Sequence, residues 1–458
     1  MIQSIPAVLV QLLGRRFRVR SSGQEAFRIA LPIMLGAVGE QVVGLLDTAF
    51  MGRVGVVELG AVGLASIWYF MLLIVGLGLG SGLQILVARR LGEKDTPAAG
   101  RAFDQTLSLT LVIGAVMYLL HWTLTPMLFR YFTQSDAIYT ACMTYLNYRS
   151  LDLIFVLQIF LLEGFYNGLG KNRIVVYTTI ILATSNALLN FVLVFGLGSI
   201  PAMGIAGVAI ASAAAHVLSW AVLWGHLFYK KYPKAFELFR TLRLRRTTTL
   251  RLLNLSAPII LQYLSGMVAF FVFLSLIEKM GETALAASNV MKAAYLFFMI
   301  PTWGFGSATS TLVSRRIGEG RKNSVWPTLW YVAQVNFLLM LVLTSSLVLF
   351  PRQVLGIFTT NAQVISATLD LLWVTVPALW GYALSGILLN ALIGTGASRW
   401  TMYIEMLNAC LYIGYLFVAI HFGASLQTMW MSEWIYVTML AVLPFVLLKS
   451  GRWRRIEL

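Results

Sequence analysis

The stretch GLGLGSGLQILVARRLGE, residues 76–93, resembles a second stretch of the same chain, TWGFGSATSTLVSRRIGE, residues 302–319. The two stretches match without gaps at an offset of 226 residues, and two glycines and the motif RRxGE recur in both. The same offset pairs Gly168 with Gly394 near the end of a later apolar segment. Self-similarity at one constant offset is the signature of an internal repeat. We therefore predict that the chain is built from two related halves.

The composition predicts an integral membrane protein. Of the 458 residues, 59% are hydrophobic and 11% are charged, whereas soluble domains carry roughly 25% charged residues. A membrane-spanning helix needs roughly 20 apolar residues, and membrane barrels show short alternating segments that are not found in this sequence. Twelve apolar segments are long enough to be all-α spans: 27–51, 57–86, 103–126, 141–168, 174–197, 203–229, 253–278, 283–312, 327–350, 367–394, 400–422 and 427–448.

Each repeat holds six of these spans. Because six is even, both repeats enter the membrane in the same direction, which is the parallel-repeat architecture of many transporters. We expect two six-helix lobes around a central cleft that opens to each side in turn. The predicted parts are a cytoplasmic segment, a first lobe, a basic linker, a second lobe and a basic tail: 1–26, 27–229, 230–252, 253–448 and 449–458.

The positive charge is arranged asymmetrically along the chain. The formal net charge is +16, and most of the 34 Lys and Arg residues fall in segments that lie on one side of a twelve-span topology. This pattern follows the positive-inside rule and places both termini in the cytoplasm. Basic loops against anionic lipid explain the charge better than nucleic-acid binding does. We expect a multi-pass protein of a bacterial inner membrane, since no targeting extension was recognised.

The stretch GEQVVGLLDTAFMG, residues 39–52, places two acids inside the first span. Glu40 and Asp47 are seven residues apart, so a helix brings them onto one face, about 20° apart and roughly 10 Å along the axis. Gln41 and Thr48 lie beside them and are candidates for a cavity wall. Acids within a membrane usually mark ion or substrate paths, although they can also simply hydrogen-bond to neighbouring helices. A buried carboxylate can exchange a proton or hold Na⁺, so both acids are candidate coupling sites.

Other polar residues of the first half could share this site. Asn186 and Asn190 are one turn apart in the fifth span and could meet an acid from the first span. Glu163 and Asn167 are likewise one turn apart near the cytoplasmic end of the fourth span, where a solvated rim position is an equally good interpretation. In the same span Arg149 precedes Asp152 by three residues, which favours a local ion pair.

The second half offers two candidates, Lys292 in the eighth span and Glu405 in the eleventh. They could form a buried ion pair, and a purely structural pair is the more economical interpretation. Cys142 and Cys410 both lie in predicted spans and show neither a disulfide framework nor metal-ligand spacing.

Three segments together carry a family resemblance. LLDTAFMGRVGVVELGAVGLA, FYNGLGKNR and NALLNFVLVFGLGSIPAMGIAGVAIAS, with the paired VARRLGE and VSRRIGE, resemble the multidrug and toxic-compound extrusion (MATE) family. The resemblance covers nearly the whole chain after residue 25. It implies a non-enzymatic, cofactor-free antiporter of two six-helix lobes, which exports amphipathic and often cationic compounds in exchange for H⁺ or Na⁺. We expect it to act as a monomer.

The resemblance carries over to individual residues only in part. Asp47 falls on the family's first-span aspartate, which would bind the metal ion if Na⁺ is the coupling ion, and Asn186 and Asn190 fall on the fifth-span pattern. In the DinF-like branch the second of these positions is usually aspartate. The acids of the NorM-like branch in spans seven and ten are missing, and Gly266 lies near one of the expected places. Coupling should therefore depend on Asp47, with Glu40 or Glu163 as a candidate replacement for a lost acid.

Two alternative functions remain open from the sequence. A flippase of related fold for lipid-linked precursors would need cationic groups in its cleft, and Arg149 and Lys292 are the candidates. A membrane-embedded enzyme would need a nucleophile, metal or cofactor constellation, and none was recognised in the sequence.

Overall fold

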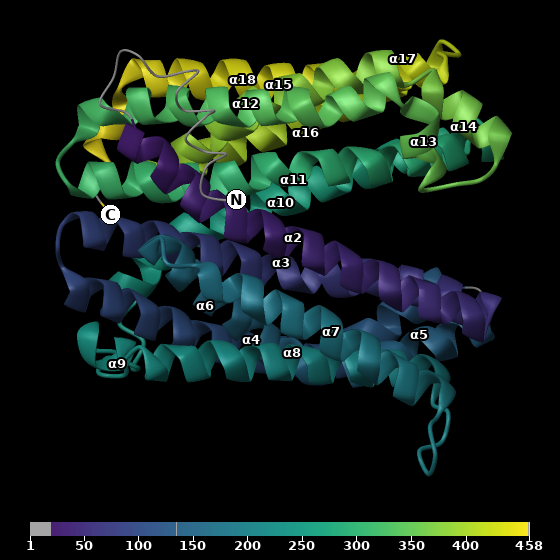
Figure 1. Cartoon of the computed structure of the whole chain (residues 1–458), viewed down its shortest axis with the longest axis horizontal. Coiled ribbons are helices and arrows are strands. Elements are labelled where there is room, and N and C mark those ends of the chain that lie inside the picture. Colours follow the sequence, from purple (N-terminus) through teal and green to yellow (C-terminus); the bar gives the residue numbers. More distant parts are fainter. Residues whose placement is uncertain (1–19, 134, 457) are drawn as a thin grey trace. The chain divides into compact units, whose positions relative to one another are not determined.

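The computed structural model describes residues 20–133, 135–456 and 458 (Figure 1). Within these residues the chain is helical apart from its turns and one isolated bridge between Leu197 and Ile200. In the described part of the chain, twelve helical segments are long and apolar enough to cross a membrane, which confirms the all-α, twelve-span prediction. The segments run Gln24–Val54, Val56–Gly92, Thr96–Phe132, Asp136–Leu169, Arg173–Phe195, Gly204–Tyr229, Arg246–Glu278, Glu282–Gly318, Lys322–Leu349, Leu372–Gly394, Ser398–His421 and Leu426–Ser450.

Several helices extend beyond the predicted spans, because a helix can continue through charged residues that an apolar window excludes. The second span, for example, continues through Arg89 and Arg90 to Gly92. The predicted span 367–394 is divided between two helices, one ending at Leu369 and the next beginning at Leu372.

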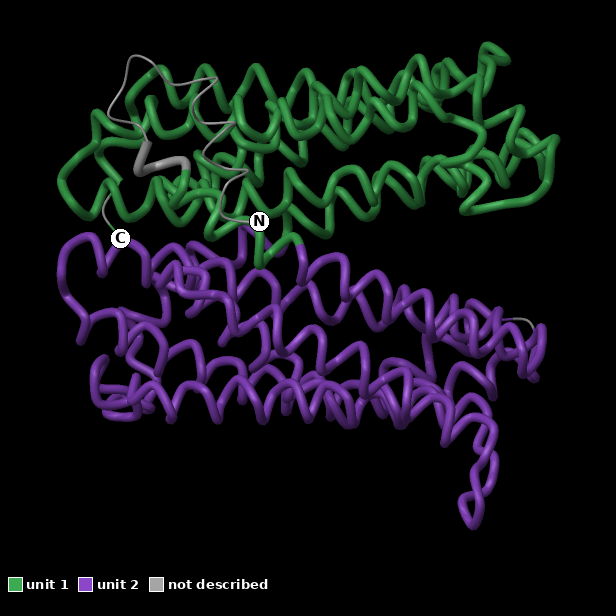
Figure 2. The backbone as a smooth tube through the Cα atoms, viewed as in Figure 1, with its two compact units in different colours: residues 1–34, 261–458 green, residues 35–260 purple. Residues whose placement is uncertain are grey.

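The chain divides into two compact units (Figure 2). Unit 2 comprises residues 35–260, and unit 1 comprises residues 1–34 and 261–458. The helices of unit 2 are α3 (Val56–Gly92), α4 (Thr96–Phe132), α5 (Asp136–Arg149), η1 (Ser150–Asp152), α6 (Leu153–Leu169), α7 (Arg173–Phe195), α8 (Gly204–Tyr229) and α9 (Tyr232–Ala235). Those of unit 1 are α11 (Glu282–Gly318), η2 (Lys322–Ser324), α12 (Val325–Leu349), α13 (Pro351–Gly356), α14 (Ala362–Leu369), α15 (Leu372–Gly394), α16 (Ser398–His421), α17 (Leu426–Trp430), α18 (Ser432–Ser450) and η3 (Arg452–Arg455).

Two helices, α2 (Arg20–Val54) and α10 (Arg246–Glu278), are each shared between the units. The sequence placed the lobe boundaries in the linkers, whereas the contacts divide the chain inside these helices, after residues 34 and 260. The reason is close packing by the first half of each helix. In unit 1, a Cβ atom on Gly304 would lie 2.4 Å from the Met34 side chain. In unit 2, a Cβ atom on Gly78 would lie 2.3 Å from Ile260.

The internal repeat is visible in equivalent helix contacts within each unit. A Cβ atom on Gly168 of α6 would lie 2.7 Å from the carbonyl oxygen of Gln84 on α3. A Cβ atom on Gly394 of α15 would lie 2.6 Å from the carbonyl oxygen of Ser310 on α11. Both pairs are related by the 226-residue offset that defines the repeat. Small residues let membrane helices approach closely, so each half uses the same backbone-to-backbone contact.

The basic linker is packed onto unit 2 by two buried polar side chains of α4. The Asp104 carboxylate accepts hydrogen bonds from the backbone amides of Phe239 at 2.7 Å and Thr241 at 2.9 Å. Gln105 accepts from the Arg245 amide at 2.7 Å and donates to the Arg243 carbonyl at 2.9 Å. The sequence indicated only that the linker is charged. In the structure, hydrogen bonds to α4 fix the backbone of the linker.

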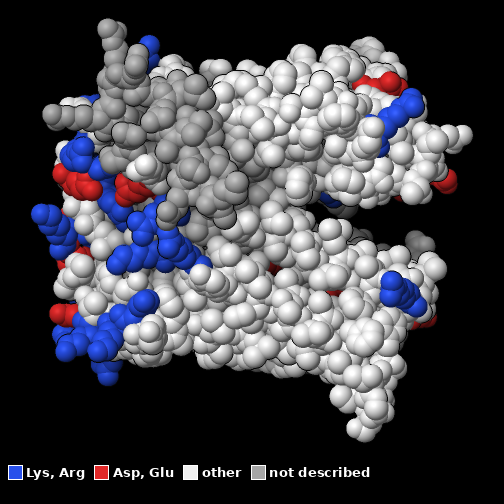
Figure 3. All heavy atoms as spheres, in the orientation of Figure 1, with Lys and Arg blue, Asp and Glu red and all other residues white. Residues whose placement is uncertain are grey.

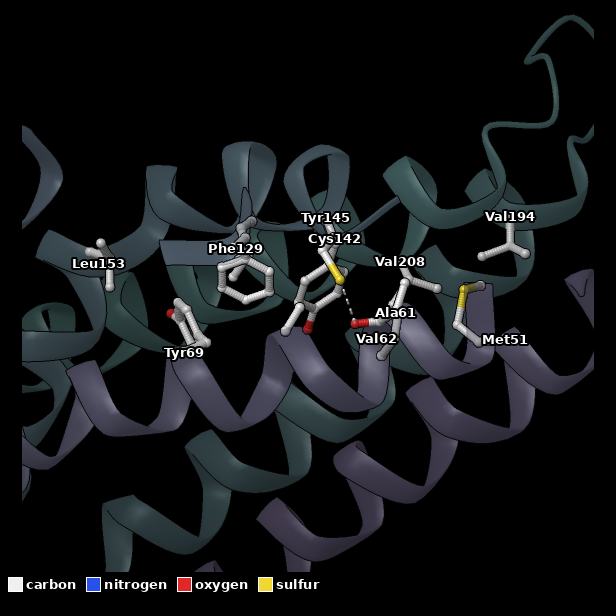
Figure 4. Close-up of a cluster of buried hydrophobic side chains, with 13 residues drawn as sticks. Met51, Ala61, Val62, Tyr69, Phe129, Cys142, Tyr145, Leu153, Val194 and Val208 are labelled. Carbon is white, nitrogen blue, oxygen red and sulfur yellow. Dashed lines mark hydrogen bonds between the residues drawn. The ribbon is translucent and has the colours of Figure 1, made fainter. Parts of the chain in front are cut away.

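A buried apolar cluster sets the orientation of the second half of α2 (Figure 4). Met51 of α2 is completely buried in this cluster, whose other members come from α3, α4, α5, α6, α7 and α8. Cys142 of α5 lies within the cluster, with its Sγ 3.5 Å from the carbonyl oxygen of Ala61. Because Asp47 precedes Met51 by one turn, the packing of Met51 also turns Asp47 toward the interior of unit 2.

Charged side chains lie near the helix ends of each unit (Figure 3). On the visible face, within each unit, a broad band almost without blue or red spheres separates the two ends. Such a band suits the hydrocarbon core of a bilayer.

The repeat contact at Gly394 predicts a stability difference between two glycine substitutions. Gly394→Ala should destabilise the protein by about 1–3 kcal/mol, because the Ser310 backbone cannot yield to the new methyl group without moving a helix. Gly414→Ala in α16 is the matched control, since nothing lies within 4 Å of a Cβ atom there. Thermal unfolding in detergent should show a lower midpoint for Gly394→Ala than for Gly414→Ala. Equal midpoints would contradict the close contact.

Candidate functional site

The Asp47 carboxylate lies at the centre of a buried hydrogen-bond network in unit 2. Its Oδ1 accepts from Asn190 Nδ2 at 2.7 Å and from Asn186 Nδ2 at 3.2 Å. Its Oδ2 accepts from the Ser212 hydroxyl at 2.9 Å. The structure thus brings together Asp47, Asn186 and Asn190, which the sequence had proposed as one site. It adds Ser212 as a fourth member.

The partners of Asp47 are held by bonds among themselves. Asn186 and Asn190 lie one turn apart on α7, and the Asn190 amide donates to Asn186 Oδ1 at 3.0 Å. The Asn186 amide also donates to Ser212 at 2.9 Å. The close approach of α8 to α7 depends on Gly207, where a Cβ atom would lie 2.7 Å from the Leu193 carbonyl oxygen.

The network suits a negative charge and leaves one oxygen free to bind something else. Both asparagines are completely buried and Asp47 is 8% exposed. A buried charge is costly unless hydrogen-bonded, and here three donors converge on one carboxylate. The Asn190 Oδ1 atom accepts no hydrogen bond from any residue that the structure describes. An acceptor oxygen beside a carboxylate is a suitable ligand for a cation.

A second charged cluster adjoins the first along α8. Asp152 binds the Arg149 guanidinium, which confirms the predicted local pair, and it accepts from the Tyr69 hydroxyl at 2.5 Å. His216 Nδ1 lies 2.8 Å from Asp152 Oδ2. The Arg149 guanidinium also lies 4.4 Å from the centre of the Tyr69 ring. Since His216 follows Ser212 by one turn, α8 contributes one polar side chain to each cluster.

The remaining acids of unit 2 lie apart from this network. Glu40 is exposed, as are Gln41 and Thr48, and the Thr48 hydroxyl donates to the Gly44 carbonyl of its own helix at 2.8 Å. Glu163 is partly buried, and its carboxylate is close enough to Glu40 for their charges to interact.

Asn167 lies in the turn that ends α6. Its Oδ1 accepts from the Asn172 amide at 2.9 Å. This contact supports the turn, and it connects Asn167 with neither Glu163 nor the Asp47 network.

The Lys292–Glu405 ion pair that the sequence allowed is not found among the residues that the structure describes. The Lys292 ammonium lies 4.8 Å from the centre of the Phe270 ring. Glu405 instead accepts a hydrogen bond from the Tyr436 hydroxyl of α18 at 2.7 Å. Each side chain instead contacts a residue of another helix.

Several buried polar residues, in these clusters and in unit 1, were not predicted from the sequence. Ser212 and His216 carried a usable signal, since they are polar residues one turn apart in the small-residue segment ASAAAH. Tyr69 carried none, because a tyrosine in an apolar span is usually an interface residue. Glu433 is an acid within a predicted span and could have been singled out on that ground alone.

Comparison with known proteins adds an independent observation. The MatE family model matches residues 32–192 and, a second time, residues 258–418. The two matches together cover most of the chain and are displaced by the same 226 residues as the internal repeat.

The chain belongs to the MATE family. Its relatives include the probable multidrug resistance protein NorM of Synechocystis sp., which is 27% identical over 76% of this chain and 75% of its own. The probable multidrug resistance protein YoeA of Bacillus subtilis is 24% identical over 82% of each chain. A solved structure of a MATE in complex with MaL6 has the same fold, with a TM-score of 0.86, 20% identity and coverage of 94% and 95% of the two chains.

MATE proteins are transporters, so this chain is a multi-pass membrane transporter and not an enzyme. The twelve candidate spans and the twofold family match agree with that assignment.

Proposed function

We propose that this MATE protein is a cation-coupled antiporter that exports amphipathic, often cationic, organic compounds by alternating access. Asp47 is the coupling carboxylate, and H⁺ or Na⁺ is the coupling ion. The observation that carries the proposal is the convergence of Asn186, Asn190 and Ser212 on the buried Asp47 carboxylate.

The same three residues can hold Asp47 in two states. Without a bound cation, three donors stabilise the charged carboxylate. A proton on Asp47 gives it a donor of its own, and Asn190 Oδ1 is a buried acceptor that receives no hydrogen bond from the described residues. A half-turn of the Asn190 amide would instead present its oxygen to a Na⁺ ion, which favours carboxylate, amide and hydroxyl oxygens.

Competition for one carboxylate would produce antiport. A cationic substrate and the coupling ion both favour the charged Asp47 site, so binding of one weakens binding of the other. Coupling also requires that the empty charged state changes conformation slowly, because a ligand shifts an equilibrium only through its different affinities for the two states.

Glu40 and Glu163 form a second acidic element of the same unit. Their charges interact, and Glu40 is exposed while Glu163 is partly buried. Two neighbouring carboxylates attract a cation. We assign them the role of extending the polar path taken by cationic compounds.

The cationic groups fit a flippase less well than the acids fit an exporter. Arg149 is neutralised by Asp152 and buried, so it is not available to an anionic head group. The Lys292 ammonium lies against the Phe270 ring, so it too already has a partner within the protein.

Transport in proteoliposomes tests the coupling role directly. Wild-type protein should export ethidium when either a pH gradient or a Na⁺ gradient is imposed, and the effective gradient identifies the coupling ion. Asp47→Asn should abolish gradient-driven efflux, because a neutral amide cannot alternate between a charged and a cation-bound state. The assay measures the initial rate of ethidium fluorescence change.

Two further variants calibrate that result. Ser212→Ala should reduce the rate less than Asp47→Asn does, because it removes one of three donors and leaves the charge. Asp136→Asn makes the same chemical change at an exposed ion pair with Arg130 and should leave transport unchanged. Wild-type rates in Asp47→Asn would show that the carboxylate is structural, and no efflux under either gradient would favour the flippase.

We further propose a bacterial inner-membrane location with both termini in the cytoplasm, because the basic segments gather on one side of the topology. A single cysteine introduced at Lys322, in a variant whose Cys142 and Cys410 are replaced by Ala, should resist a membrane-impermeant maleimide in intact cells. A cysteine at Arg352 should be labelled. The opposite pattern would contradict the orientation.

A further inference from the structure

Unit 1 contains its own pair of buried acids, at positions unrelated to Asp47. Glu405 of α16 is 3% exposed and Glu433 of α18 is 8% exposed. Glu433 accepts from the hydroxyls of Tyr412 at 3.0 Å and Tyr295 at 3.3 Å. The charges of both carboxylates reach Tyr436, which donates to Glu405.

Three buried oxygens around Glu405 lack a donor among the residues that the structure describes. They are Glu405 Oε2, Gln262 Oε1 and Asn408 Oδ1. Gly266 of α10 brings the first two together, since its Cβ atom would lie 3.3 Å from Glu405 Oε1 and Gln262 precedes it by one turn. Asn408 follows Glu405 by three residues, and its amide donates to the Tyr436 carbonyl at 3.2 Å. One carboxylate oxygen and two amide oxygens are thus buried on neighbouring turns of α10 and α16 without a hydrogen-bond donor among the described residues.

The repeat shows which residues of unit 2 correspond to those around the acid of unit 1. The 226-residue offset equates Glu40 with Gly266, and Thr179 with Glu405. In unit 2, Thr179 packs against Gly39, whose Cβ atom would lie 2.0 Å from Thr179 Cγ2. At these two pairs of equivalent positions, unit 2 has its acid in the first span of the repeat and unit 1 has its acid in the fifth.

A second pair of equivalent residues supports this comparison. Tyr69 and Tyr295 occupy equivalent positions, and each donates a hydrogen bond to a buried carboxylate of its own unit, Asp152 or Glu433. The charge of Asp152 is balanced by Arg149, whereas neither Glu405 nor Glu433 has an ion-pair partner among the described residues.

We propose that unit 1 holds a Na⁺ site formed by Glu405, Gln262 and Asn408, with Glu433 nearby as a second negative charge. A proton on Glu405 would provide one donor, which can reach only one of the two amide oxygens. One Na⁺ ion can bind several oxygens at once and adds the positive charge that this cluster lacks. The proposal does not depend on the coupling role of Asp47.

Equilibrium binding of ²²Na⁺ to the purified full-length protein in detergent tests this site. The measurement is made in the Asp47→Asn variant, so that any Na⁺ bound at Asp47 is removed first. We expect this variant to bind ²²Na⁺ with a stoichiometry of about one, since one carboxylate with two amides forms one site. Adding Glu405→Gln should weaken binding at least tenfold.

Two additional variants keep the result decisive. Glu282→Gln changes an exposed acid of the same unit and should bind ²²Na⁺ as Asp47→Asn alone does. Gln262→Leu keeps the acid but removes an oxygen ligand, so it should also weaken binding, which covers the case in which Glu405→Gln does not fold. The proposal is overturned if the Asp47→Asn variant binds no ²²Na⁺, or if neither Glu405→Gln nor Gln262→Leu weakens binding. If the Asp47→Asn variant no longer exports ethidium but still binds ²²Na⁺, the Na⁺ site of unit 1 is supported independently of the coupling role of Asp47.

Discussion

A carboxylate inside a membrane protein must be given hydrogen-bond donors or a cation, and this requirement at Asp47 organises unit 2. Asp47 is buried, so the two neighbouring helices α7 and α8 deliver the donors. Two asparagines one turn apart on α7 provide two, and α8 provides the third through Ser212. The close contact at Gly207 and the buried Met51 set the positions of α8 and α2 that make this possible.

The two halves have the same arrangement of helices, but their buried acids lie at different positions and have different partners. Equivalent contacts at Gly168 and Gly394 hold equivalent helices together, so the helix framework is common to both. The polar residues are not, because Asp47 corresponds to Phe273, and Asn186 to Tyr412. The repeat therefore preserves packing while the acids occupy different spans, and the two units can bind different partners within one fold.

The helical spans were predictable because apolar length is a local property of the sequence. Asp47, Asn186 and Asn190 were also predictable, since a buried acid needs partners and two amides share a helix face. Ser212 was missed although it lies one turn before His216 in a small-residue segment, because that spacing indicates a polar helix face but not which helix the face meets. The Lys292–Glu405 pair that the sequence allowed is not found among the described residues, because the sequence shows opposite charges but not the contacts with Phe270 and Tyr436. Nor can a local pattern show that α2 and α10 are shared between units, which depends on tertiary packing.

Competition for Asp47 can be measured most directly as ethidium binding to the purified protein at equilibrium. If one carboxylate serves both ligands, the apparent Kd for ethidium should rise in proportion to the concentration of the coupling ion, varied as Na⁺ or as pH. In Asp47→Asn this dependence should disappear. A Kd in the wild-type protein that changes with neither ion would contradict the account, as would an unchanged ion dependence in Asp47→Asn.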